Sequence, residues 1–144
     1  MSYTIDANVL LYASDESSPL HATARDIIGR IADGPEVAYL FWPTVMAYLR
    51  IATHPAVFTR PLTLTEAVGN MQALLDRPNV RSVGEGEAFW RTFRGVADDA
   101  LPAGNLVPDA HLTALMLENE VKTILTRDRD FRRFPRIEVR DPFD

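Results

Sequence analysis

The stretch YTIDANVLLYA, residues 3–13, places a charged side chain between two apolar segments. Residues 3–5 have the pattern of a short strand that ends at Asp6. The apolar run from Val9 to Tyr12 follows almost at once. A carboxylate between two such segments is costly to bury without a partner. Asp6 is therefore expected either to cap a helix or to hold a metal ion.

The rest of the chain alternates predicted strands and helices. Further strands are predicted over residues 36–41, 79–84, 122–126 and 137–142, and helices over residues 17–33, 42–54, 62–76, 85–100 and 108–120. Pro43 and Pro108 suit first helical turns, and Thr65 is the predicted N-cap of the 62–76 helix. This alternation predicts an α/β fold with a mostly parallel central sheet and helices on both faces, built as one domain over residues 1–144.

Composition and charge narrow the class of protein. The net charge of −5 argues against broad, charge-driven binding of nucleic acid. The chain has no cysteine, which excludes thiolate metal sites and suits a reducing cytoplasm. It also has no export-type segment and no apolar run of membrane-spanning length. We therefore expect a cytoplasmic protein that does not enter membranes.

The charge is distributed unevenly along the chain. Residues 1–48 carry a net charge of −4, whereas residues 122–136, KTILTRDRDFRRFPR, carry +4. All but one of the 15 basic residues are arginine, which suits bidentate contacts with phosphate. Arg127, Arg129, Arg132 and Arg133 are candidate RNA contacts, with a solvated surface or an ion pair as the alternative.

Four carboxylates fall at positions where a parallel sheet would gather them. Asp6 and Asp128 each follow a predicted strand, Asp130 comes two residues later, and Asp109 opens a helix directly after Pro108. Taken singly, each has a structural explanation as a cap, a turn residue or an ion-pair partner. Taken together, they would converge on one edge of the sheet, where like charges repel unless a cation offsets them.

Oxygen ligands of this kind suit Mg²⁺ or Mn²⁺, which bind through carboxylates, water and substrate phosphate. The three histidines are not spaced as a zinc-hydrolase pair, so a zinc hydrolase is not expected. A phosphoryl-transfer protein with a phosphorylated Asp6 is a second possibility. It is disfavoured because Asn8 stands where an aspartyl-phosphate hydrolase needs a second Asp, and no acidic pair precedes Asp6 as a receiver domain needs.

Four stretches in this order resemble the PIN-domain ribonucleases, and more narrowly the VapC toxins of bacterial toxin–antitoxin pairs. They are TIDANVLLYA, WPTVMAYLRIATHPAVF, GNLVPDAHLTALM and ILTRDRDFRRFP, and together they span nearly the whole chain. The resemblance implies a three-layer α/β/α PIN-like fold and a Mg²⁺-dependent endoribonuclease, with Mn²⁺ as another usable metal. It also implies a homodimer and inhibition by a cognate VapB-type antitoxin.

The resemblance assigns roles to single residues. It makes Asp6, Asp109 and Asp128 the catalytic acids and metal ligands, with Asp130 as an assisting ligand. In the family a polar residue at the position of Asn8 often supports the first acid. Independently of the family, the Thr126 hydroxyl could hydrogen-bond a carboxylate or a phosphate, with an ordinary β-branched residue at a strand end as the alternative.

One family acid is missing. Many PIN domains carry a glutamate three residues after a Ser or Thr on the helix that follows the second strand, and counting from Thr44 leads to Ala47. No acidic residue lies between Glu36 and Glu66. A single metal ion is therefore favoured over two. The alternative is a degenerate PIN domain that binds RNA or a protein partner without cleaving.

Overall fold

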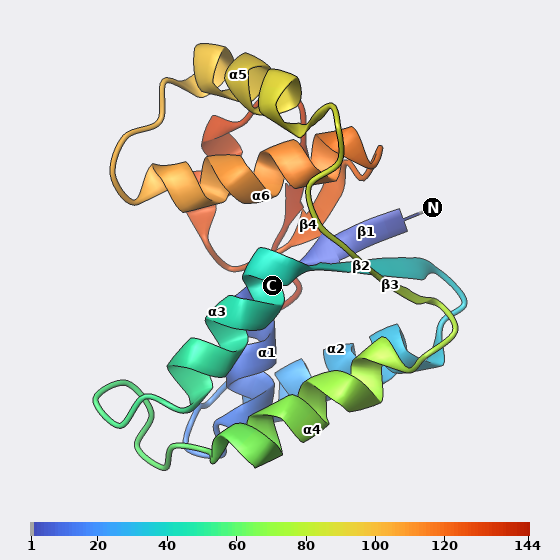
Figure 1. The fold of residues 1–144 in the computed structure, drawn as a ribbon. Helices are drawn as coiled ribbons and strands as arrows, with labels where there is room; N and C mark the ends of the chain where they lie inside the picture. The colour runs from blue at the N-terminus through green and yellow to red at the C-terminus, as the bar shows by residue number, and fades with distance from the viewer. Residues whose placement is uncertain (1) are drawn as a thin grey trace.

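Five parallel strands form one central sheet in the order β3-β2-β1-β4-β5 (Figure 1). The structure is a computed structural model that describes residues 2–144. The strands are β1 (Ser2–Ile5), β2 (Val37–Phe41), β3 (Val80–Val83), β4 (Thr123–Leu125) and β5 (Glu138–Arg140). All four pairings are parallel, as the alternation of strands and helices predicted.

The order of the strands reverses at β1. The chain first builds outward from β1 through β2 to β3, and then returns to place β4 and β5 on the other side of β1. Ile5 pairs with Leu125 at the carboxyl ends of β1 and β4, and the Asp6 N–H donates to the Leu125 carbonyl over 3.1 Å. In open parallel sheets such a reversal leaves a crevice beyond the strand ends, where ligands bind.

Helices cover both faces of the sheet, as predicted (Figure 1). One face carries α1 (Ala7–Ser14), α2 (His21–Asp33), α3 (Trp42–Ala52) and α4 (Leu64–Leu75), and the other carries α5 (Phe89–Ala100), α6 (Leu106–Glu118) and the short 3₁₀ helix η1 (Arg129–Arg133). The described part of the chain contains no helix that is both long and apolar enough to cross a bilayer.

Each face has its own apolar core. Leu40 belongs to the core under α1–α4, and the next residue, Phe41, belongs to the core under α5 and α6. Neighbouring residues of a strand point to opposite faces, so β2 contributes side chains to both cores. Both side chains are fully buried. The paired cores fix the strand ends, and with them the position of the acidic residues.

Several predicted boundaries and contacts were wrong. The N-cap of α4 is Thr63 and not Thr65, because only Thr63 lies three residues before Glu66 and forms the reciprocal capping box. On α2 the helical pattern places Ala22 on the apolar face with Ile27 and Ile31, but Ala22 is exposed and the core-facing alanine is Ala24. Helix α5 begins at Phe89 and α6 ends at Glu118, because the turn geometry at both places competes with the helical pattern.

Candidate metal centre

Asp6 caps α1 directly after β1. Its Oδ1 accepts a hydrogen bond from the Ala7 N–H over 2.7 Å, and its backbone is extended, as is usual for an N-cap residue. Its Oδ2 accepts the hydroxyl hydrogen of Thr126 over 2.9 Å. The capping role expected from the sequence is therefore present, and each carboxylate oxygen keeps further acceptor capacity toward the crevice.

The Thr126 hydroxyl connects the ends of β1 and β4. It donates to Asp6 and accepts from the Asn8 side-chain amide over 3.3 Å and from the Asp128 N–H over 2.9 Å. These three bonds use its one hydrogen and both lone pairs, and its side chain is only 1% exposed. A hydroxyl that is satisfied in this way holds the carboxylate of Asp6 in one orientation.

Asp128 and Asp130 come from the segment that leaves β4. Asp128 is the N-cap of η1, and its Oδ1 accepts the Asp130 N–H over 2.9 Å. This bond fixes the turn that carries both carboxylates, and Phe131 anchors the turn because it is buried in the core beneath it. Asp128 is half-buried and Asp130 is exposed.

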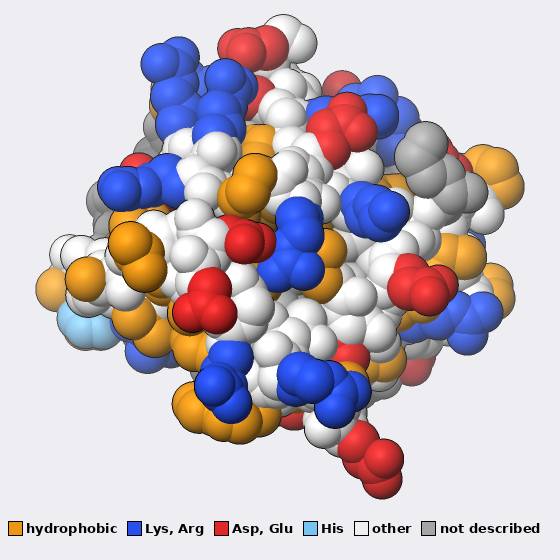
Figure 2. Space-filling model, turned by 90° about the horizontal axis from the view of Figure 1, so that it is seen from above, with side chains coloured by type: hydrophobic (Ala, Val, Ile, Leu, Met, Phe, Trp, Pro, Cys, Tyr) orange, Lys and Arg blue, Asp and Glu red, His pale blue; other side chains and the backbone are white. Residues whose placement is uncertain are grey.

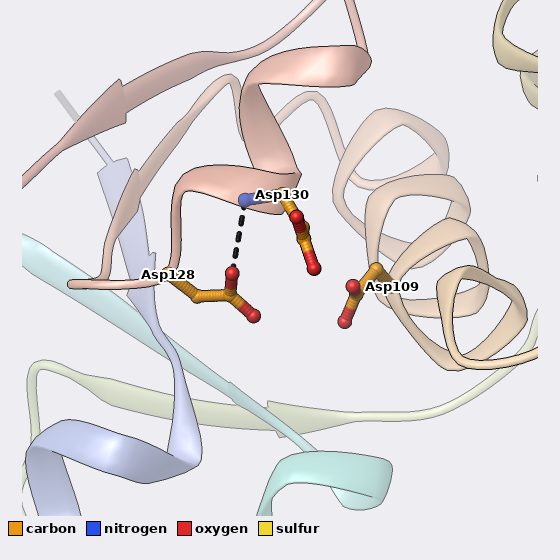
Figure 3. A group of neighbouring side chains, drawn as sticks. All are labelled: Asp109, Asp128 and Asp130. Atoms are coloured by element: carbon orange, nitrogen blue, oxygen red, sulfur yellow. Dashed lines mark hydrogen bonds between the residues drawn. The ribbon is translucent and has the colours of Figure 1, made fainter.

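Asp109 reaches the same place from α6. It lies in the first helical turn, where a negative charge favours the helix dipole. Ala110, Leu112 and Leu115 bury the inner face of α6 and so fix its angle to the sheet. Figure 3 shows Asp109 pointing from α6 toward Asp128 and Asp130. One carboxylate oxygen from each of these three residues lies within 4.8 Å of the others.

We call Asp6, Asp109, Asp128 and Asp130 the acidic centre. Three of its members, Asp109, Asp128 and Asp130, form the close group. Asp6 lies outside that group and is connected to the turn of Asp128 by the hydrogen bonds of Thr126. Asp6 still acts on Asp109 through its charge. The structure thus brings all four predicted acids to the sheet reversal, but in a grouping that the sequence did not indicate.

The like charges change the acidity of the centre. Partial burial, together with the charges of Asp128, Asp6 and Asp130, raises the pKa of Asp109 from 3.8 to about 7. Burial also raises the pKa of Asp6, and the hydrogen bonds from Thr126 and Ala7 act in the opposite direction. Unpaired carboxylates this close together are stabilised by a cation, so their chemistry fits a hard divalent ion.

Two further features lie beside the acidic centre: a buried amide oxygen without a donor and a helix without an acidic residue. Asn8 Oδ1 is buried without a hydrogen-bond donor from residues 2–144, although its amide nitrogen is engaged. Helix α3 brings no carboxylate, since Ala47 stands at the family's glutamate position and no acid lies between Glu36 and Glu66.

The candidate arginines are not equivalent. The Arg127 guanidinium lies 3.8 Å from the carboxylate of Asp141, so it has a protein partner. Arg129 and Arg132 are exposed on η1 and form no ion pair within residues 2–144. Figure 2 shows basic side chains spread over the α5 side of the molecule, with acidic ones among them.

Comparison with known proteins agrees with this arrangement. The family model described as PIN domain matches residues 3–137. The chain is 48% identical over 143 residues to Ribonuclease VapC48 of Mycobacterium tuberculosis, covering 99% of each protein. It is 37% identical over 140 residues to Ribonuclease VapC43 of the same organism, covering 97% of this chain and 95% of that one.

Solved structures share the fold at low identity. VapC20 of Mycobacterium tuberculosis, described as a Sarcin-Ricin loop cleaving toxin, aligns with a TM-score of 0.68 and 16% identity over 96% of this chain and 99% of that one. VapBC2 of Rickettsia felis, bound to a DNA fragment from the promoter, aligns with a TM-score of 0.70 and 11% identity over 97% and 98%.

The parallel sheet, the acids gathered at its reversal and the match to the PIN-domain family model together identify the class of protein as a PIN-type nuclease domain. The chain belongs to the PIN-domain family and, within it, to the VapC branch. A PIN nuclease domain implies a divalent metal ion, and Asp109, Asp128 and Asp130 form a group that could bind one.

Proposed function

We propose that this chain is an endoribonuclease and the toxin of a type II toxin–antitoxin system, formed as one PIN-like domain over residues 1–144. The observation that carries the proposal is the gathering of Asp109, Asp128 and Asp130 at the sheet reversal of a chain 48% identical to a named VapC ribonuclease. The reaction is hydrolysis: water forms a new bond to phosphorus while one phosphodiester P–O bond of RNA breaks.

The acidic centre is proposed to hold Mg²⁺, with Mn²⁺ as a substitute, through Asp6, Asp109, Asp128 and Asp130. The bound ion would supply an activated water and would offset charge on the phosphate oxygens. The preference for Mg²⁺ rests on the all-carboxylate donor set. The raised pKa of Asp109 supports the proposal, since it reflects burial and, after it, repulsion by like charges, and a bound cation would offset both.

The protein's own groups would orient the reacting parts. Asp6, Asp109 and Asp128 are the proposed catalytic acids. Thr126 would keep the Asp6 carboxylate in one rotamer, and Asn8 would hold the Thr126 hydroxyl in turn. Arg129 and Arg132 are proposed contacts to RNA phosphates outside the centre, and Arg127 would have to leave Asp141 to join them.

A cognate VapB-type antitoxin is the proposed protein partner, and a homodimer is the proposed assembly. Solved fold neighbours are toxin–antitoxin complexes, from Rickettsia felis and nontypeable Haemophilus influenzae among others. The proposed place of action is the cytoplasm, where both RNA and antitoxin would be met.

Cleavage of a structured RNA pool tests the proposal. The purified chain, free of antitoxin, is incubated with Mg²⁺, with Mn²⁺ or with EDTA beside the Asp6→Asn variant. Asparagine keeps the helix cap, so the variant should fold. Cuts that require metal and vanish in the variant are expected. Cuts that persist in EDTA would contradict the metal-dependent mechanism.

A degenerate PIN domain is the second candidate, favoured by the absence of any carboxylate on α3. Such a protein would bind RNA or a protein partner without hydrolysis. Metal binding by calorimetry without cleavage under either metal would favour it over the nuclease.

A further inference from the structure

The short helix η1 presents three different lines of side chains. A 3₁₀ helix has three residues per turn, so residues i and i+3 lie one above the other. Phe131 and Phe134 form the first line, and both are buried, with ring centroids 6.4 Å apart. The second line holds Arg129 and Arg132. The third holds Asp130 and the residue one turn later, Arg133.

The third line is the one that faces the acidic centre. Asp130 points toward Asp109 in Figure 3, and its carboxylate belongs to the close group with Asp109 and Asp128. Arg133 begins one turn further on, about 6 Å along the axis. An arginine side chain spans that distance. Arg129 and Arg132 are turned by about a third of a circle away from this line.

Arg133 shares with Arg129 and Arg132 the lack of an ion-pair partner within residues 2–144, whereas three other arginines of this region have one. Arg127 lies against Asp141, Arg136 donates to Asp99 over 2.8 Å, and Arg140 donates to Glu138 over 2.7 Å. Arg133 is exposed and forms no ion pair within residues 2–144. Its guanidinium is therefore free to meet a ligand, and the buried rings of Phe131 and Phe134 fix the turn that carries it.

The net charge of the acidic centre explains why an arginine beside it would help an RNA phosphate to bind. Four ionised carboxylates exceed the charge of one divalent ion, so the loaded centre still carries excess negative charge toward an RNA phosphate. An adjacent guanidinium offsets that charge and offers paired donors to two phosphate oxygens. Because α3 carries no acid, the centre is expected to bind one metal ion and not two. A positively charged side chain is then still needed to offset the remaining negative charge.

We infer that Arg133 contacts the RNA phosphate at the acidic centre, whereas Arg132 stays outside it. This inference rests on the proposed ribonuclease function and deepens it. The two residues are adjacent, equally charged and both exposed, so they form a matched pair that differs in the line of η1 on which they stand.

The test compares single-turnover RNA cleavage by the wild type, Arg133→Ala, Arg132→Ala and Arg133→Lys. Arg133→Ala should cleave about 100-fold more slowly, as when one preorganised donor to a developing oxyanion is lost. Arg132→Ala should show a smaller loss, about threefold, because Arg132 is a proposed phosphate contact outside the centre. Arg133→Lys should recover part of the loss, since it restores the charge without the planar fork.

A second readout does not depend on cleavage. RNA binding is measured by fluorescence anisotropy against salt with Mg²⁺ present, in the Asp6→Asn background. Adding Arg133→Ala should lower the slope of log K against log salt by about one, and adding Arg132→Ala should lower it less. Equal slopes and equal cleavage losses in the two alanine variants would overturn the inference.

The outcomes separate the two proposals. If the wild type cleaves and the two alanine variants behave alike, the ribonuclease stands and the role of Arg133 falls. If the wild type cleaves no RNA, the proposed function falls, and the binding slopes still decide whether Arg133 contacts phosphate. Equal melting temperatures for all variants are expected because both arginines are exposed.

Discussion

Asp6 and Asp109 both belong to the acidic centre but are held in different ways. The Asp6 carboxylate accepts hydrogen bonds from Ala7 and Thr126 and is the more buried of the two. The Asp109 carboxylate accepts no hydrogen bond from residues 2–144, and only its backbone carbonyl is engaged, by Thr113. The same chemical group is thus fixed by donors on the β1 side and left to its charged neighbours on the α6 side.

This difference shows that one fold can orient one carboxylate by hydrogen bonds while burial and neighbouring charges set the acidity of another. Burial raises the pKa of Asp6, and the hydrogen bonds from Thr126 and Ala7 offset part of that effect while they fix the orientation of the carboxylate. Partial burial, and after it the charges of Asp128, Asp6 and Asp130, raise the pKa of Asp109 to about 7. Asp6 is therefore preorganised, whereas the state of Asp109 depends on what binds beside it. Each experiment below acts on one side of this contrast.

The largest effect is expected from Asp109→Asn. It removes a proposed metal ligand, so RNA cleavage should fall by about 1,000-fold, equivalent to roughly 4 kcal/mol. The same variant should stabilise the metal-free protein at pH 8, because it removes a charge that Asp128, Asp6 and Asp130 repel. Cleavage assays and thermal melts in EDTA measure the two effects.

The informative result is that RNA cleavage falls while the stability of the metal-free protein rises. A variant that simply damaged the fold would lose activity and stability together. Asp109→Asn with normal cleavage would remove Asp109 from the chemistry, and a lower melting temperature in EDTA at pH 8 would contradict the repulsion.

A smaller loss is expected from Thr126→Val, which acts on the Asp6 side. Valine fills the same volume but removes the side-chain donor to Asp6, and it leaves the Asn8 amide and the Asp128 N–H without their acceptor. Cleavage should fall roughly 10- to 100-fold, as for other residues that orient metal ligands. Stability should fall by about 2 kcal/mol, because buried polar groups lose their partner. Urea titration and single-turnover kinetics measure both.

Thr126→Ser is the matched control, since it keeps the hydroxyl. It should retain most of the activity. If serine and valine lose activity equally, the methyl group and its packing matter more than the hydrogen bonds, and the preorganisation of Asp6 is not the cause.

The pH dependence of the metal-free protein's stability tests the raised pKa of Asp109 without a substitution. The folded-state pKa of about 7 lies above the ordinary value of 3.8, so between these values the folded state keeps a proton that the unfolded state has released. Stability in EDTA should therefore fall as pH rises from about 4 to 7, by about 1 kcal/mol after allowance for solvent screening. Urea titrations at several pH values give the slope.

In Asp109→Asn this part of the slope should disappear, whereas Thr126→Val should keep it. A wild-type protein whose stability does not fall across this range would mean that the carboxylates of the acidic centre are further apart in solution.

The smallest effect is expected from Ala47→Glu, which returns the missing family acid to α3. One more carboxylate near the centre should tighten Mn²⁺ binding by about fivefold, close to 1 kcal/mol for a solvated charge pair. Isothermal calorimetry measures the affinity. No change with the fold intact would show that α3 does not face the ion, and that the loss of the glutamate has been without consequence.

The sequence predicted the overall architecture because its signals are local. Alternating strands and helices, with Pro43 at a helix start, indicate a parallel α/β sheet whichever way the chain packs. Local competition defeated the finer predictions: Thr63 rather than Thr65 caps α4 because the capping box requires a glutamate three residues later.

The residues of the acidic centre could be predicted from their positions in the sequence, but their arrangement in space could not. Acids after β1 and β4 must meet if the strands are neighbours, so Asp6 and Asp128 could be paired from the sequence alone. That Thr126 joins Asp6, Asn8 and Asp128 through one hydroxyl, and that Asp109 stands without donors among like charges, could not.

By itself the sequence determined which residues carry charge, where strands and helices lie, and which family the motifs resemble. Only the tertiary structure decided which carboxylates share a site, which one is fixed by hydrogen bonds, and which line of η1 stands with Asp130. The physical reason is distance: residues 6, 109 and 128 interact only after two separate cores have placed β1, β4 and α6 side by side.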